Sequence, residues 1–127
     1  FTYGKHGSTF GGNPLASMAG LTTLETIAQD NLRENAETIG DWMCDRFKAE
    51  FAGMSGIEAI RNAGLMIGIQ LAKPCGELVK RALEHKLLIN VTADNVVRLL
   101  PPLVIDQDEA GKIVDILSPL IKNFLNE

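Results

Sequence analysis

The sequence has few of the features that mark disulfide-stapled, metal-binding or membrane-spanning proteins. It contains only two cysteines, Cys44 and Cys75, in 127 residues, with no CxxC pair and no histidine at ligand spacing. A disulfide scaffold and a zinc site are therefore disfavoured, and both cysteines are expected to be reduced thiols. The apolar stretches are far shorter than the roughly 18 residues needed to cross a bilayer, and no signal peptide is recognisable. We expect a cytoplasmic protein.

Positive charge is also scarce. Twelve Lys and Arg stand against 16 Asp and Glu, which gives a net charge of -4, and the basic residues form no run. This balance argues against nucleic acid or an anionic membrane as a partner, and favours small molecules or proteins. His6 and His85 have no acid or nucleophile at a suggestive spacing, so the sequence does not support a catalytic triad.

What is present is the composition of one ordinary soluble domain. Hydrophobic residues make up 46% and charged residues 22% of the chain, and its length allows a buried core without disulfides or metal. The chain has no initiator Met, and a glycine-rich loop near its start follows no predicted helix or strand. We therefore expect a piece of a longer protein.

The apolar pattern predicts an α+β fold. Asn13 and Pro14 begin a helix with apolar residues at helical spacing, and Asn31 with Glu34 resembles a capping box that starts a second helix. The run 65–71, apolar on both faces, is typical of a central strand, and a short helix follows. Strands 87–91 and 96–100 form a hairpin, and a final helix begins at a capping signal and carries a kink at a proline. The sequence thus predicts a small, mostly antiparallel sheet with helices on one face. Asn13 and Asn31 are the expected first caps, Asp106 with Glu109 is the capping signal of the last helix, and Pro119 is the expected site of its kink.

The densest candidate for chemistry is the loop over residues 7–14, which reads GSTFGGNP. Two hydroxyls and three glycines before a helix N-terminus can hold a phosphate or a carboxylate. Composition alone leaves an ordinary capped turn equally acceptable. The loop is neither a Walker motif nor a dinucleotide-binding fingerprint.

Arginines supply the next candidates. Arg98 is the only charged residue between Val96 and Val104, and a guanidinium on a stiff strand matches a carboxylate. The alternative is an edge-strand arginine paired with a local acid. Arg61 is a candidate for a second anion site or for a structural role. Lys5 beside the loop lacks the apolar surroundings that activate a lysine, so we interpret it as an exposed residue.

Three segments resemble motifs of one enzyme family in order and spacing. Residues 6–16, HGSTFGGNPLA, residues 61–68 and residues 97–103 resemble segments of the class III, ornithine-type aminotransferases, which use pyridoxal phosphate. The resemblance covers essentially the whole chain. Asn62 departs from the glycine usual at its position in the second motif.

The resemblance implies a role for three residues. Thr9 matches the threonine that reaches across a homodimer to the cofactor phosphate of the other subunit. Ser8 matches its neighbour, next to both phosphate and substrate. Arg98 matches the arginine that binds the substrate α-carboxylate, and this assignment outweighs the structural alternative.

The resemblance also implies what the chain does not supply. The family's Schiff-base lysine, its pyridinium-pairing aspartate and its stacking aromatic match no residue here, so the chain is expected to contain no catalytic residue and to be inactive and unable to retain pyridoxal phosphate alone. It resembles the C-terminal third of a fold type I enzyme. Residues 1–52 correspond to the cofactor loop and the helices leading out of the large domain, and residues 53–127 to the small C-terminal α+β domain.

The implied reaction moves an amino group to 2-oxoglutarate. N-acetylornithine, as used in arginine biosynthesis, is the favoured donor, and ornithine, succinylornithine and 4-aminobutyrate are alternatives within the family. A free-standing, non-catalytic α+β binding module is the alternative from another class.

Overall fold

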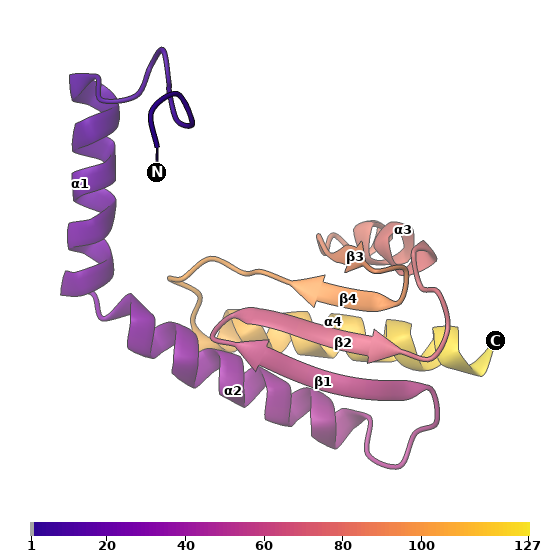
Figure 1. Cartoon of the computed structure of the whole chain (residues 1–127). Coiled ribbons are helices and arrows are strands. Elements are labelled where there is room, and N and C mark those ends of the chain that lie inside the picture. Colours follow the sequence, from indigo (N-terminus) through magenta and orange to yellow (C-terminus); the bar gives the residue numbers. More distant parts are fainter. Residues whose placement is uncertain (1) are drawn as a thin grey trace. The chain divides into compact units, whose positions relative to one another are not determined.

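The computed structural model describes residues 2–127, which form four helices and four strands in two compact units (Figure 1). The first unit is Phe1–Leu32 and the second is Arg33–Glu127. The elements in chain order are α1 (Pro14–Gln29), α2 (Leu32–Glu50), β1 (Ile57–Ala63), β2 (Met66–Leu71), α3 (Glu77–Glu84), β3 (Asn90–Thr92), β4 (Val96–Leu99) and α4 (Gln107–Asn126). The division at residue 52 concerns domains of a longer protein and stays a prediction. Within this chain, α2 belongs with the sheet.

The first unit consists of the glycine-rich loop and α1. The predicted helix start is confirmed, because the Asn13 side chain accepts a hydrogen bond from the Ala16 N–H at 3.0 Å and Pro14 occupies the first turn. The helix has no buried residue, and most of its apolar side chains are exposed, with Leu15 at 82% and Leu24 at 67%. Within the described residues, α1 therefore presents an uncovered apolar surface.

The break between α1 and α2 is where the sequence predicts it, but the capping box is wrong. Asn31 has a φ of 53°, whereas an N-cap residue has extended backbone. Asn31 tolerates the left-handed conformation better than most residues and serves as a turn residue here.

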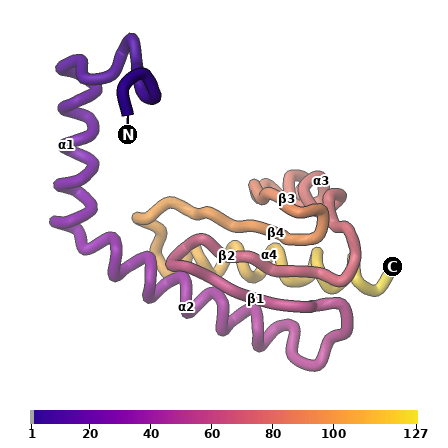
Figure 2. Tube along the Cα trace, viewed as in Figure 1, coloured from indigo at the N-terminus to yellow at the C-terminus, as the bar shows by residue number. Residues whose placement is uncertain are grey.

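The second unit is built on an antiparallel sheet of strand order β1-β2-β4-β3. The predicted hairpin is confirmed as β3 and β4, although β3 is shorter than expected. Strand β1 is not among the predicted strands, and it pairs with β2 in an antiparallel hairpin (Figure 2). Gly64, in the turn between them, has a φ of 55°. The chain therefore contains two hairpins, and β2 and β4 form the centre of the sheet.

One face of the sheet carries the core. Ile67, Ile69 and Leu71 of β2 are completely buried beneath the helices, together with Val97 of β4. The helical side of this core comes from α2, α3 and α4 and includes Met43, Phe47, Leu78, Leu117 and Ile121. Helices on one face are thus confirmed. The prediction of a central strand at 65–71 is confirmed by β2, but only one face of this strand is buried, because Met66 is 54% exposed and Gly68 and Gln70 share its open face.

Two polar contacts close the β3–β4 hairpin against the end of β2. The Asn95 carbonyl accepts from the Leu71 N–H at 2.9 Å, and the Asn95 side-chain amide donates to the Leu71 carbonyl at 2.7 Å. Ala93 and Asp94, both at positive φ, form the turn, and the Asp94 carbonyl accepts from the Cys75 N–H at 2.8 Å. These bonds hold strained turn residues in place.

The last helix begins and continues largely as predicted. Asp106 and Glu109 form a reciprocal capping box, and the helix continues through Pro119. The kink at Pro119 stays a prediction. The Ser118 hydroxyl beside this proline is buried without a partner in the described part of the chain. Among residues 2–127, no helix is long and apolar enough to span a membrane.

Candidate functional site

The open face of the sheet carries a row of four directly paired residues, one from each strand. Arg61 of β1 lies opposite Gly68 of β2, Gly68 lies opposite Arg98 of β4, and Arg98 lies opposite Asn90 of β3. Directly opposed residues project from the same face of a sheet. A groove of about 290 Å³ runs over this row and is lined by Arg61, Asn62, Ala63, Met66, Gly68, Thr92, Val96 and Arg98. Among residues 2–127, no acidic side chain lines this groove.

Arg98 has the properties of a ligand-binding residue. It is exposed on a central strand, between the buried Val97 and Leu99, and its guanidinium makes no hydrogen bond or ion pair within residues 2–127. The structural alternative, an edge-strand arginine paired with a local acid, fails on both counts. Five donors in a rigid fork are thus available to a carboxylate.

Arg61 is held differently. Its guanidinium donates to the Gln70 side-chain oxygen at 2.9 Å, and the Gln70 amide donates in turn to Glu58 at 2.6 Å. The neutral Gln70 therefore separates Arg61 from the nearest carboxylate of this network. Arg61 has no ion pair among the described residues and adds positive charge to the groove.

Asn62, which departs from the family motif, has a structural contact. Its side-chain amide donates to Asp41 of α2 at 2.8 Å and to the Gly64 carbonyl at 3.3 Å. It thereby ties the β1–β2 turn to the helix beneath the sheet. A second tie is made by Asn35 of α2, whose amide donates to the carbonyls of Leu103 and Ile105 at 2.8 and 3.0 Å. The segment that follows Arg98 is anchored by this amide.

Ser8 and Thr9 lie in the first unit. Both side chains are exposed, and the Ser8 hydroxyl accepts from the Gly11 N–H at 2.9 Å. The Thr9 hydroxyl makes no bond within residues 2–127, and the loop leads into the N-terminus of α1. An open hydroxyl beside a helix N-terminus is a donor set that fits a phosphate. The ability of Thr9 and Ser8 to hold the cofactor phosphate stays a prediction.

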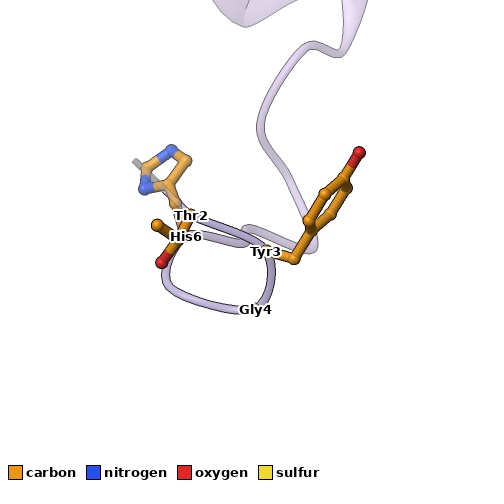
Figure 3. Close-up of a pocket in the computed structure, with 4 residues that line it drawn as sticks. All are labelled: Thr2, Tyr3, Gly4 and His6. Atoms are coloured by element: carbon orange, nitrogen blue, oxygen red, sulfur yellow. The ribbon is translucent and has the colours of Figure 1, made fainter.

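A wide cavity of about 610 Å³ lies beside this loop, lined by Thr2, Tyr3, Gly4 and His6 (Figure 3). All four residues are exposed, and the Tyr3 ring points away from Thr2 and His6. It is a bend of the chain rather than an enclosed site, and it contains neither Ser8 nor Thr9.

The cysteines have no part in either candidate site. Cys44 and Cys75 are free and buried, and burial raises the pKa of both thiols. Raised pKa values make them poor nucleophiles at neutral pH. Within the described residues no group of three His, Cys, Asp or Glu side chains could hold a metal ion.

The chain matches a known family over almost its full length. The model of "Aminotransferase class-III" matches residues 1–121. The chain is 52% identical over 125 residues to acetylornithine aminotransferase 1 of Bordetella bronchiseptica, covering 98% of this chain and 32% of that protein. It is 41% identical over 119 residues to acetylornithine aminotransferase of Methanosarcina mazei, covering 92% of this chain and 29% of that protein.

Solved structures agree with the sequence comparison. The acetylornithine aminotransferase of Elizabethkingia anophelis has a TM-score of 0.83 at 32% identity, covering 98% of this chain and 34% of that one. The ornithine aminotransferase of Plasmodium yoelii has a TM-score of 0.86 at 28% identity, covering 98% of this chain and 34% of that one. The chain spans about a third of the length of the curated relatives it matches.

The small antiparallel sheet with helices on one face is the fold that this chain shares with the solved class III aminotransferase structures named above. The chain belongs to the class III aminotransferases. Its resemblance in sequence is strongest, among the relatives given above, to proteins named acetylornithine aminotransferase.

Proposed function

We propose that the chain is the C-terminal part of an aminotransferase that moves the amino group of N-acetylornithine to 2-oxoglutarate in arginine biosynthesis. The observation that carries this proposal is Arg98, an exposed guanidinium without an acid partner in residues 2–127, at the floor of a groove that no carboxylate lines. The donor is inferred from relatives at 52% and 41% identity that are named acetylornithine aminotransferase. The complete protein is proposed to be a cytoplasmic homodimer that uses pyridoxal phosphate.

Arg98 binds the α-carboxylate in this proposal. Two parallel N–H···O bonds from the guanidinium fix the orientation of the carboxylate as well as its position. The oxo acid acceptor carries a carboxylate next to its reacting carbon, whereas N-acetylornithine reacts at its terminal amine and carries its carboxylate at the other end of the chain. Each substrate thus presents a carboxylate that one arginine can bind in its own half-reaction. Orientation of this kind raises the rate by holding the reacting groups in near-attack geometry.

Thr9 and Ser8 serve the cofactor in this proposal. Pyridoxal phosphate, when bound, would supply the electron sink for bond cleavage at the substrate carbon that bears the reacting amine. The Thr9 hydroxyl donates to its phosphate, from the neighbouring subunit, and Ser8 supports the same loop. The lysine that would bind the cofactor covalently corresponds to none of the seven lysines of this chain.

The donor assignment is tested by steady-state kinetics of the complete enzyme. We expect kcat/KM with 2-oxoglutarate to be highest for acetylornithine when acetylornithine, ornithine, succinylornithine and 4-aminobutyrate are compared. The 127-residue chain, assayed alone with pyridoxal phosphate, is the negative control and should show no turnover. A complete enzyme that prefers ornithine would favour the ornithine aminotransferase alternative. The structural similarity to the Plasmodium yoelii ornithine aminotransferase is the observation that supports this alternative. Turnover by the 127-residue chain alone would contradict the proposal that the lysine that binds the cofactor is not one of its lysines.

Replacing Thr9 by valine in the complete enzyme should weaken cofactor retention. Valine keeps the shape of threonine but cannot donate, and an uncompensated phosphate oxygen costs about 1–3 kcal/mol. Dialysis followed by fluorescence titration with pyridoxal phosphate measures the loss. Thr22→Val is the matched control, because Thr22 is an exposed threonine on α1, outside the loop. Equal cofactor affinity in the two variants would reduce Thr9 to a turn residue.

A further inference from the structure

Gly68 lies between Arg61 and Arg98 in the row of paired residues across the sheet, at a position where the fold itself does not require glycine. Gly64, by contrast, has a positive φ, and Gly68 is not among the residues with one. A Cβ on Gly68 would lie 3.5 Å from Val96 Cγ1 and 3.8 Å from Arg61 Cγ, which are ordinary van der Waals contacts. Neither backbone conformation nor packing among the described residues explains the missing side chain.

A glycine inside a strand normally weakens it, because glycine has no side chain to pack and loses more conformational freedom on folding. Interior strand glycines often mark places where a ligand approaches the backbone closely. Gly68 meets this condition, since it lies on the uncovered face of a central strand and lines the groove. The absence of a side chain therefore leaves space for something outside the described chain.

The charges around Gly68 indicate what could occupy that space. Arg61 and Arg98 flank it on the neighbouring strands, and neither forms an ion pair within residues 2–127. Elsewhere in the same unit, Arg81 pairs with Glu77 and Glu127, and Lys122 pairs with Glu50. Two uncompensated guanidiniums on either side of a glycine favour an anionic ligand.

We propose that Gly68 is a specificity-determining residue of the Arg98 site. It keeps the floor of the groove open, so that the carboxylate end of the substrate lies against the backbone of β2 between Arg61 and Arg98. The ligand class that fits is an amino or 2-oxo acid whose carboxylate, with the carbon that bears it, occupies the space that a side chain on Gly68 would fill. This inference rests on the proposed function and adds the steric determinant to it.

The test fills the groove in the complete enzyme. Gly68→Ala should raise KM for both substrates about threefold and Gly68→Val about tenfold or more, with kcat at saturation nearly unchanged, because the lost interaction is one of binding. The melting temperature should stay equal or rise, since both replacements favour a strand over glycine. Affinity for pyridoxal phosphate should not change.

Ala59→Val is the matched control. Ala59 lies on β1 opposite Gln70, on the same sheet but outside the residues that line the groove. The added methyl groups should leave both KM values at the wild-type level. If Gly68→Val fails to fold, Gly68→Ala decides by the same measurement, because its Cβ fits without a clash.

Two outcomes would overturn the inference: unchanged KM values in the Gly68 variants, or a loss confined to thermal stability. Arg98→Lys, measured in parallel, separates this failure from that of the proposed function. Impaired Arg98→Lys with normal Gly68 variants removes only the role of Gly68. Normal kinetics of Arg98→Lys removes the carboxylate site itself.

Discussion

Arg98→Lys in the complete enzyme is expected to lower kcat/KM at least tenfold in both half-reactions while leaving thermal stability unchanged. Lysine keeps the charge but loses the planar fork that binds a carboxylate through two bonds. If the bound substrate forms a bidentate, desolvated pair with Arg98, truncating one partner costs roughly 2–5 kcal/mol, and about 1.4 kcal/mol corresponds to a factor of ten. Stability should not change, because Arg98 makes no hydrogen bond or ion pair with residues 2–127.

The matched control is Arg33→Lys. Arg33 is also exposed and without an ion pair in the described chain, but it lies on α2 and not in the groove. Single-turnover kinetics with each substrate and a melting curve should show an effect of Arg98→Lys alone. A lower melting temperature with wild-type kinetics would identify Arg98 as a structural residue.

Gly40→Ala is expected to produce the largest loss of stability among single-methyl additions to this chain. Gly40 lies in α2, and a Cβ there would overlap the carbonyl group of Gly64 in the β1–β2 turn. Backbone cannot rotate away as a side chain can, so the helix and the turn must separate. Overpacking of this kind costs about 1–3 kcal/mol and occasionally more. At about 4 °C per kcal/mol, the value at which the ranges for smaller and larger domains meet, the melting temperature of the chain should fall by at least about 4 °C.

Gly111→Ala is the control, because its melting temperature is expected to change in the opposite direction. Gly111 lies inside α4, and its Cβ would meet only Trp42 Cη2 at 3.7 Å, an ordinary contact. Alanine in a helix is more favourable than glycine by about 0.5–1 kcal/mol, so this variant should melt higher than wild type. Thermal unfolding followed by circular dichroism compares the two. Equal melting temperatures for both variants would show that α2 and the turn can move apart freely.

Local chemistry explains which parts of the fold were predictable. Two helix starts, at Asn13 and at Asp106, and the hairpin whose second strand carries Arg98 depend on neighbouring residues. All three are confirmed. The strand β1 was missed because its burial alternates irregularly around a register shift between Ile57 and Ala59. A bulge of this kind removes the strict period of two by which strands are recognised.

The candidate site was predictable one residue at a time but not as an arrangement. Arg98 stood out as a lone charge in an apolar run, and Arg61 as a weaker candidate. Their placement on either side of Gly68 depends on strand order and register, which no local pattern specifies. The exposure of α1 was likewise unpredictable, because periodicity identifies an apolar face but not what covers it.

The row across the sheet makes the site and the strand register mutually dependent. Sliding β4 by one residue against β2 would exchange its two faces. Arg98 would then point into the core, beside Ile67 and Ile69, and Val97 would point to the open face. An unpaired guanidinium in that core would cost several kcal/mol, so the misaligned sheet is strongly disfavoured. The arginine that binds substrate in our proposal therefore also disfavours the shifted register of β4. A neutral replacement such as Arg98→Leu would remove this energetic penalty together with the binding group.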